Sequence, residues 1–126
     1  MTPTLVRELI AALGSDRVRT GSTELALYAR DASNMEGDTS VVCLPTSTEE
    51  VVACVRIALA HGVPFVARGS GTGLAGGAVP LDGAVVIALS KMNRVLSVDP
   101  VNRTAWVEPG VLNLDLSRFT IGDGLH

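Results

Sequence analysis

Glycine is concentrated in residues 68–80, which read R-G-S-G-T-G-L-A-G-G-A-V-P and hold five of the 13 glycines of the chain. This stretch directly follows the short apolar run 63–67, which is typical of a buried strand. Glycine lets the backbone take positive φ angles and lets a ligand approach the main chain without meeting a side chain. Successive N–H groups can then form an anion-binding concavity. The stretch therefore predicts a loop that holds a diphosphate.

Two familiar phosphate-binding patterns do not explain this loop. Residues 71–76 match G-x-G-x-x-G, but that pattern indicates a nicotinamide-type fold only when its last glycines open a helix and an acidic residue follows about 20 positions later. Here Pro80 and Gly83 come too soon after the loop for a helix to form. A Walker loop is excluded because no Lys-Ser or Lys-Thr pair follows the glycines.

Side chains that could catalyse a reaction by themselves are missing. The sequence has no Cys/His cluster, no helical H-E-x-x-H and no nucleophile with a base. We therefore predict no catalytic residue and no metal site, and we expect the chemistry to come from a cofactor or from residues outside the chain. His61 is expected at a helix C-terminus, where histidine interacts with the last carbonyls. Cys43 and Cys54 are expected to be reduced core thiols.

Together with its two flanks, the glycine-rich stretch resembles the pyrophosphate loop of the FAD-linked oxidases of the vanillyl-alcohol oxidase and p-cresol methylhydroxylase type. The flanks are residues 45–51, P-T-S-T-E-E-V, and residues 89–95, L-S-K-M-N-R-V. Within that family the chain most resembles the FAD subunit of glycolate oxidase and the D-lactate and D-2-hydroxy-acid dehydrogenases. Residues 28–33 also resemble the family's lead-in to the flavin domain, and they fit a solvated turn equally well.

The resemblance implies a non-covalently bound FAD whose diphosphate lies against the loop amides. Thr72 stands where some relatives carry the histidine that attaches covalently to the flavin. Pro45 would lie beside the adenine end of FAD, although a strand-ending proline fits the residue type equally well. Arg68 would either contact phosphate or anchor the loop, and the sequence leaves both roles open. The implied cofactor-binding residues are Pro45, Arg68, Gly69, Ser70, Gly71, Thr72, Gly73, Leu74, Gly77 and Ala78.

The implied function is FAD binding within an oxidoreductase that converts a 2-hydroxy acid, of the glycolate or D-lactate class, to the 2-oxo acid. Family members are several times longer, so the chain is expected to be an N-terminal fragment that is inactive alone. A missing domain would bind the small-molecule substrate, and an electron-transfer partner subunit could accept the electrons. Two alternatives stay open: a FAD oxidoreductase of the same fold acting on another alcohol, aldehyde or sugar, and a non-catalytic nucleotide-binding module.

The helices and strands expected around the loop predict an α+β fold. The family resemblance implies that this fold is the N-terminal part of a FAD-binding domain of the p-cresol methylhydroxylase type. A small parallel βαβ unit is followed by a mainly antiparallel sheet. Residues 41–44 are expected to form a buried strand that Pro45 ends. Ser47 and Glu50 form a capping box for a helix with an apolar stripe over 51–59. A right-handed crossover between parallel strands then leaves Pro45 and the loop at the strands' carboxyl ends, where ligands bind.

The other predicted elements are a helix over 4–13, a short helical piece within 20–30, strands over 84–89, 94–98 and 103–108, and a helix starting over 111–118. Ser22 or Thr23 is expected to cap the short helical piece. The last two strands form a hairpin, in which Trp106 is expected to serve in packing. We divide the chain into a helical lead-in, 1–40, and the first part of the FAD-binding domain, 41–126.

Composition bounds the remaining possibilities. The 126 residues are the size of one domain, and at 47% hydrophobic but only 3% aromatic content its core must be aliphatic. The net charge of −3, without basic residues interleaved with aromatic ones, argues against a nucleic-acid partner. Neither a secretory signal nor an apolar run of about 18 residues is recognisable. We therefore expect a cytoplasmic protein without a transmembrane segment.

Overall fold

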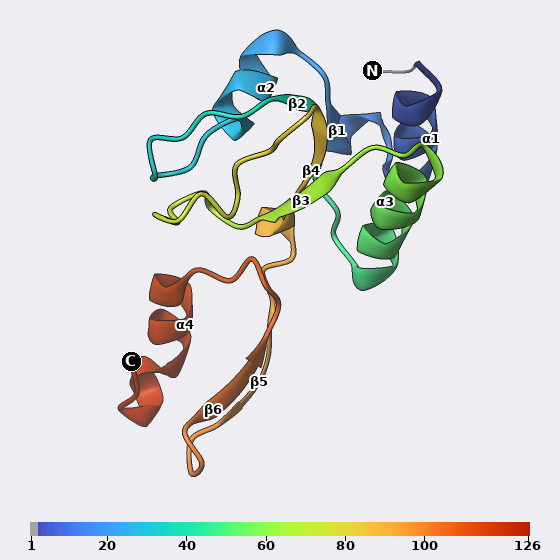
Figure 1. Ribbon diagram of the computed structural model, residues 1–126. Coiled ribbons are helices and arrows are strands. Elements are labelled where there is room, and N and C mark those ends of the chain that lie inside the picture. The colour runs from blue at the N-terminus through green and yellow to red at the C-terminus, as the bar shows by residue number, and fades with distance from the viewer. Residues whose placement is uncertain (1–2) are drawn as a thin grey trace.

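The fold is taken from a computed structural model that describes residues 3–126. A mixed sheet with helices on both faces forms one part, and a hairpin with one helix extends from it (Figure 1). The helices are α1 (Pro3–Leu13), α2 (Ser22–Tyr28), α3 (Thr48–Ala60) and α4 (Asn113–Thr120). The strands are β1 (Val18–Arg19), β2 (Thr39–Cys43), β3 (Phe65–Arg68), β4 (Ala84–Ala88), β5 (Val95–Asp99) and β6 (Thr104–Val107).

The main sheet has the strand order β1-β2-β4-β3. Strands β2, β4 and β3 are parallel, whereas β1 runs antiparallel to β2 at one edge. Cys43 of β2 and Ala67 of β3 both pair with Ile87 of β4, so the carboxyl ends of β2 and β3 lie at the same level. The parallel βαβ unit β2–α3–β3 is therefore confirmed, with β4 inserted between its two strands. Pro45 and the glycine-rich loop leave the sheet at the same edge.

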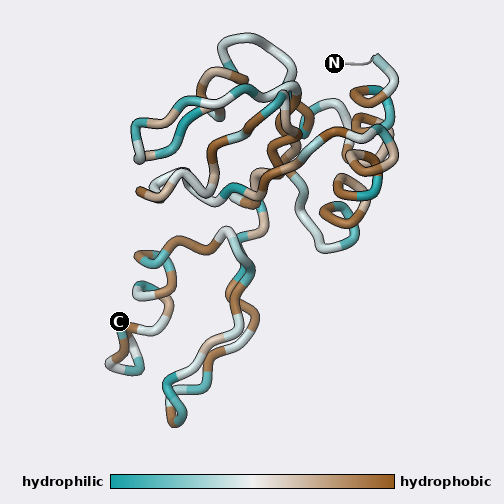
Figure 2. Tube along the Cα trace, viewed as in Figure 1, coloured by the Kyte–Doolittle hydropathy of each residue, from teal (hydrophilic) through white to brown (hydrophobic). Residues whose placement is uncertain are grey.

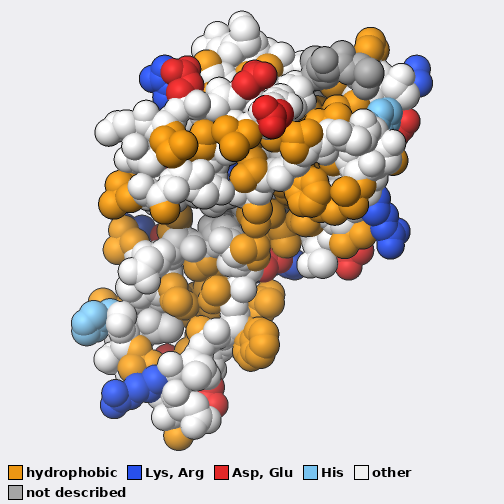
Figure 3. All heavy atoms as spheres, in the orientation of Figure 1, with side chains coloured by type: hydrophobic (Ala, Val, Ile, Leu, Met, Phe, Trp, Pro, Cys, Tyr) orange, Lys and Arg blue, Asp and Glu red, His pale blue; other side chains and the backbone are white. Residues whose placement is uncertain are grey.

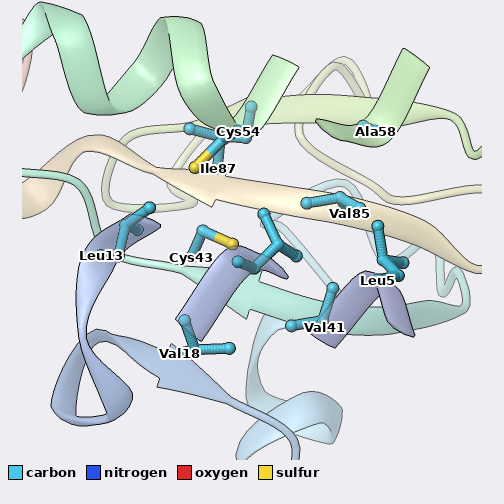
Figure 4. Close-up of a cluster of buried hydrophobic side chains, with 10 residues drawn as sticks. Leu5, Leu13, Val18, Val41, Cys43, Cys54, Ala58, Val85 and Ile87 are labelled. Atoms are coloured by element: carbon cyan, nitrogen blue, oxygen red, sulfur yellow. The ribbon is translucent and has the colours of Figure 1, made fainter. Parts of the chain in front are cut away.

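One face of this sheet is covered by α1 and α3. Leu5, Leu9 and Leu13, spaced four residues apart on α1, are fully buried, because that spacing places them on one side of the helix. They pack with residues of the sheet and α3, including Val85, in the cluster drawn in Figure 4. Cys43 and Cys54 are both free and buried in this cluster, as predicted. Complete burial of each leucine contributes about 1.5–3 kcal/mol.

The opposite face packs on α2. Val86 and Ala88 of β4 point to this side, together with Val42, and Leu25 and Tyr28 of α2 pack against them. Every residue of β4 is buried, as expected for a central parallel strand with helices on both faces. By contrast β3 is an edge strand in which Phe65 is 42% exposed. The expected buried strand over 63–67 is thus displaced by one to two residues and half-exposed.

The C-terminal part consists of the antiparallel hairpin β5–β6 followed by α4, and it extends away from the main sheet (Figure 1). The turn of the predicted hairpin is fixed by Asp99, whose carboxylate accepts hydrogen bonds from the Asn102 backbone and side-chain amides at 3.0 and 2.7 Å. Along the trace of Figure 2, apolar and polar segments alternate here. All four residues of β6 are exposed. Trp106 is 76% exposed, so the prediction that it serves in packing is wrong for the described residues 3–126.

The predicted capping box of α3 is half correct. Ser47 Oγ accepts a hydrogen bond from the Glu50 amide at 3.3 Å, as expected. The Glu50 carboxylate, however, accepts from the Thr46 amide at 2.7 Å rather than from that of Ser47. It also pairs with Arg17 at 2.6 Å. This long-range ion pair joins the residue just before β1 to the first turn of α3 and so redirects the glutamate.

Two further helix ends differ in detail from expectation. The N-cap of α2 is Gly21, without a side-chain hydrogen bond, so neither Ser22 nor Thr23 caps it. Both residues already lie inside the first turn. α3 ends at His61 as predicted, but the imidazole lies 3.1 Å from the Glu8 carboxylate of α1. His61 therefore connects the two helices on one face of the sheet.

Candidate functional site

The glycine-rich loop connects β3 to β4 and projects from the carboxyl edge of the main sheet (Figure 1). No helix begins at Gly76, because the chain there makes only turns, one of them closed by the Val79 amide on the Gly76 carbonyl at 3.1 Å. The rejection of a nicotinamide-type fingerprint is therefore confirmed. No backbone amide from 69 to 77 donates a hydrogen bond to any of the residues 3–126.

Two glycines of the loop are required by its shape. Gly71 has φ +76° and Gly76 has φ +75°, angles that other residues rarely adopt. A Cβ at Gly71 would lie 2.0 Å from an Arg68 nitrogen, and one at Gly76 would lie 2.8 Å from the Met35 sulfur. At Gly71 the obstacle is the buried Arg68 guanidinium, whereas at Gly76 it is the end of the exposed Met35 side chain, so the positive φ is the stronger constraint at Gly76.

Three other glycines keep one side of the loop open. A Cβ added at Gly69, Gly73 or Gly77 would meet no atom within 4 Å. All three line a shallow groove of about 420 Å³ formed by the loop itself together with Ala67 and Ala78. Bare main chain with unpaired amides beside an open groove suits a ligand rich in anionic oxygen atoms. The residues present therefore fit a diphosphate.

Arg68 is directed into the protein. It is only 8% exposed, and its Nη1 donates to the Arg30 carbonyl at 2.6 Å. The guanidinium lies 5.4 Å from the centre of the Tyr28 ring, within the range of a cation–π interaction. Of the two roles that the sequence left open, these contacts favour anchoring of the loop.

The other predicted site residues fall into two groups. Pro45 is fully buried at the carboxyl end of β2, where the Thr46–Glu50–Arg17 contacts fix the backbone. Burial acts to raise the pKa of Glu50, but hydrogen bonds from Thr46 and Arg17 outweigh it and hold that pKa below its usual range. Ser70, Thr72 and Leu74 lie exposed on the loop, with the two hydroxyl oxygens 3.4 Å apart.

The sequence prediction missed residues that support the loop from a neighbouring segment. The Ala32 amide donates to the Gly73 carbonyl at 3.1 Å. Tyr28 stacks on Arg68, and Met35 fills the space beside Gly76. The signal available in the sequence was the lead-in 28–33, which fits a solvated turn equally well. Its contacts with the loop favour a role in supporting the loop over a solvated turn.

Other reactive groups lie away from the loop or lack partners for catalysis. A hydrogen bond with Cys54 and burial raise the pKa of Cys43, so this thiol stays protonated. Among residues 3–126, no group of three or more His, Cys, Asp or Glu side chains could hold a metal ion. A larger hollow of about 580 Å³, whose lining includes Ser117 and His126, lies between the hairpin and α4, away from the loop. None of the helices within 3–126 is long and apolar enough to cross a membrane.

Comparison with known sequences points to flavoproteins. A sequence profile described as "FAD binding domain" matches residues 39–126. The chain is 34% identical over 126 residues to the glycolate oxidase subunit GlcD of Bacillus subtilis, covering 99% of the chain and 27% of that protein. It is 35% identical over 125 residues to D-2-hydroxyglutarate dehydrogenase of Stutzerimonas stutzeri, covering 98% and 27%. The chain thus spans about a quarter of the length of these curated relatives.

Comparison with solved structures agrees with this. p-Cresol methylhydroxylase superimposes with a TM-score of 0.84 at 30% identity, over 97% of the chain and 25% of that protein. 4-Ethylphenol oxidase from Gulosibacter chungangensis gives 0.84 at 35% identity, over 96% and 24%. The α+β architecture is therefore that of a FAD-binding domain of the p-cresol methylhydroxylase type, as predicted. The expected family resemblance is confirmed as well.

Proposed function

Because the chain belongs to the FAD-binding domain family of flavin-dependent oxidoreductases, we propose that it binds the FAD diphosphate on the loop between β3 and β4. One observation carries the proposal: the amides of residues 69–77 donate to no acceptor within the described part of the chain, 3–126, and they lie along an open groove. Hydrogen bonds from such amides to phosphate oxygens are charge-assisted and worth about 1.5–3 kcal/mol each. The proposed cofactor-binding residues remain Pro45, Arg68, Gly69, Ser70, Gly71, Thr72, Gly73, Leu74, Gly77 and Ala78.

Within this set the residues have different proposed roles. The backbone of 69–77 would bind the diphosphate directly, and Arg68 would act from behind by fixing Gly71. Pro45 would border the adenine end through the backbone that it shapes, because its own side chain is buried. Thr72 has no nucleophilic ring nitrogen and so offers no atom like the histidine of covalent flavoproteins. The cofactor is therefore proposed to be non-covalent.

The proposed activity of the complete protein is oxidation of a 2-hydroxy acid to the 2-oxo acid. Support comes from the names of relatives, which include glycolate oxidase, D-lactate dehydrogenase and D-2-hydroxyglutarate dehydrogenase. When bound, FAD supplies the acceptor for the two electrons of this oxidation. Within residues 3–126 we identify no base that could remove the hydroxyl proton, so that base is proposed to lie outside the chain. An electron-transfer subunit is the proposed partner.

Two organisational proposals accompany the activity. We propose a lead-in over 1–40 and the first part of the FAD-binding domain over 41–126, supported by a family match that starts at residue 39. The lead-in is not separate in packing, because α1 shares its core with β2 and α3. We also propose a cytoplasmic location, which is consistent with two free buried thiols, Cys43 and Cys54.

The test of cofactor and substrate uses the complete protein purified without added flavin. We expect the protein to show the flavin absorbance bands, and acid precipitation to release all flavin into the supernatant. Under anaerobic conditions D-lactate, glycolate or D-2-hydroxyglutarate should bleach the flavin band, whereas 4-alkylphenols should not. The phenols are the matched comparison because structural neighbours act on 4-ethylphenol and p-cresol according to their names.

Each part of the proposal can fail separately. Flavin retained in the acid pellet would contradict non-covalent binding. Bleaching by 4-alkylphenols alone would replace the 2-hydroxy acid with another substrate class. A colourless protein that does not take up added FAD would leave only a non-catalytic module.

A further inference from the structure

The segment 29–38 lies along the glycine-rich loop, and the two project side by side from the main sheet (Figure 1). Contacts join them at both ends and in the middle. The Ala32 amide donates to the Gly73 carbonyl at 3.1 Å, and the Asp38 amide donates to the Pro80 carbonyl at 2.9 Å. A Cβ at Gly37 would lie 1.7 Å from the Pro80 oxygen, so the two backbones touch there. The segment therefore forms one wall of the loop.

This wall has its own bracing. Arg30 and Glu36 form an antiparallel bridge, and their side chains pair at 2.7 Å. The Gly37 amide closes the segment by donating to the Ala29 carbonyl at 2.8 Å. A braced segment can impose a shape on a neighbouring loop that has little hydrogen bonding of its own.

Asp31 is the charged residue at the centre of the wall. Its Oδ1 accepts hydrogen bonds from the Ser33 amide at 2.8 Å and from the Ser33 hydroxyl. Its Oδ2 is buried and has no hydrogen-bond donor among residues 3–126. The bonds from Ser33 lower the pKa of Asp31 most, and the Ala78 amide and the Arg68 charge lower it further. The carboxylate is therefore ionised. In the chain Asp31 stands between Arg30, whose carbonyl accepts from Arg68, and Ala32, whose amide donates to the Gly73 carbonyl.

A buried carboxylate oxygen without a donor is costly and needs a physical reason. A negative charge would also repel a diphosphate unless it is placed behind the backbone that binds it. The neighbours of Asp31 in the chain favour that arrangement, because Arg30 holds Arg68 and Ala32 holds the Gly73 carbonyl.

We propose that Asp31 is a positioning residue for the cofactor site: held by Ser33, it keeps Arg30 and Ala32 in contact with Arg68 and Gly73, and so fixes the glycine-rich loop with the amides of 69–77 free. This inference rests on the proposed binding of FAD to that loop. Asp31 itself does not touch the cofactor. Its loss leaves the loop able to collapse onto its own amides.

The test measures FAD binding to the complete protein after its flavin has been removed. Asp31→Asn keeps the shape but removes the charge, and we expect about tenfold weaker FAD binding. Ser33→Ala removes one donor to Oδ1 and should weaken binding about threefold. Asp123→Asn, at an exposed position far along the chain, is the matched control and should bind FAD like the unchanged protein. The titrations are run well below the unfolding temperature of every variant.

Hydrogen exchange of the flavin-free protein separates positioning from general destabilisation. In Asp31→Asn the Ala32 and Asp38 amides, which donate to the loop, should exchange faster, while those of β2, α3 and β4 keep their protection. Faster exchange throughout, with unchanged FAD affinity, would overturn the proposal. If Asp31→Asn does not fold, Ser33→Ala decides, and unchanged affinity there overturns the proposal as well. If the unchanged protein itself takes up no FAD, the proposed function fails first, which is a distinguishable result.

Discussion

Two kinds of glycine share the loop between β3 and β4, and they respond differently to the same methyl group. Gly71 combines φ +76° with an Arg68 nitrogen 2.0 Å from the site of a Cβ. Gly73 has an ordinary φ and open space at its Cβ position. One residue sets the shape of the loop and the other keeps a ligand path free.

At this scale we predict different outcomes for Gly71→Ala and Gly73→Ala. Gly71→Ala should lower the free energy of unfolding of the flavin-free protein by about 1–2 kcal/mol, because alanine is strained in the left-handed region. It should also weaken FAD binding, since Arg68 must move. Gly73→Ala should change the unfolding free energy by no more than about 0.5 kcal/mol and weaken FAD binding alone. Denaturant unfolding and FAD titration measure the two quantities.

Each of these two variants is the control for the other, because both add the same methyl group. Equal losses of stability in both would show that the distinction between the two glycines is wrong. Unchanged FAD affinity in both would remove the loop from the cofactor site.

The hairpin β5–β6 is held at its base by one ion pair. The Glu108 carboxylate accepts from the Arg94 amide at 2.8 Å, and Arg94 Nη2 lies 2.6 Å from Oε1. The backbone amide of Glu108 donates back to the Arg94 carbonyl at 2.9 Å. Hydrogen bonds from Arg94 lower the pKa of Glu108, and Arg94's own pKa is raised by the same bonds. This element depends on a charge, whereas the main sheet depends on apolar packing.

We predict that this contact makes hairpin stability dependent on pH. When the pKa of a carboxyl is lower in the folded than in the unfolded protein, its ionised form stabilises the fold. This stabilisation is complete at pH values above the pKa in the unfolded protein, about 4.3 for glutamate. It is lost as the pH falls through the lower pKa of the folded protein. Glu108→Gln should therefore weaken the hairpin at neutral pH and abolish this acid-dependent loss. Denaturant unfolding followed by far-UV circular dichroism, at several pH values from about 7 down to about 3, measures this loss.

Glu24→Gln provides the comparison variant. Glu24 is 48% exposed in its pair with Arg19, and such surface pairs contribute about 0–1 kcal/mol. If Glu108→Gln keeps the same acid-dependent loss as the unchanged protein, another group is responsible.

Across the whole molecule, buried apolar side chains are divided unevenly. Exposed apolar side chains occur on the main-sheet part as well as on the hairpin and α4, as Figure 3 shows, but both buried clusters belong to the main-sheet part. The exposed large ones of the C-terminal part are Leu96, Val101, Trp106, Val107, Leu112, Leu114, Phe119 and Ile121. The main-sheet part has a core of its own, and the C-terminal part does not.

Trp106 is the single tryptophan and reports on this surface. We predict that acrylamide quenches its fluorescence in the folded 126-residue chain about as efficiently as in the chain unfolded by urea, because the ring is 76% exposed. Measurements at several low protein concentrations control for self-association. Emission shifted to short wavelength with little quenching would show that the hairpin is packed in solution.

Local patterns were sufficient to predict much of the fold and the loop at its centre. The helical stripes of α1 and α3, the cap at Ser47 and the strand before Pro45 follow from residues a few positions apart, which interact in any fold. The dense glycines likewise require an irregular backbone wherever they lie. The family could be recognised from these residues and their flanks. The substrate could not, because no residue that selects it is identifiable in this chain.

Contacts between distant residues were decided only by the tertiary structure. The insertion of β4 between β2 and β3 depends on pairing across tens of residues, which no local period encodes. The inward direction of Arg68, the approach of Asp31 to the loop and the pairing of Glu50 with Arg17 depend on the same long-range placement. The exposure of Trp106 does too, because an aromatic residue is buried only where another layer exists to cover it.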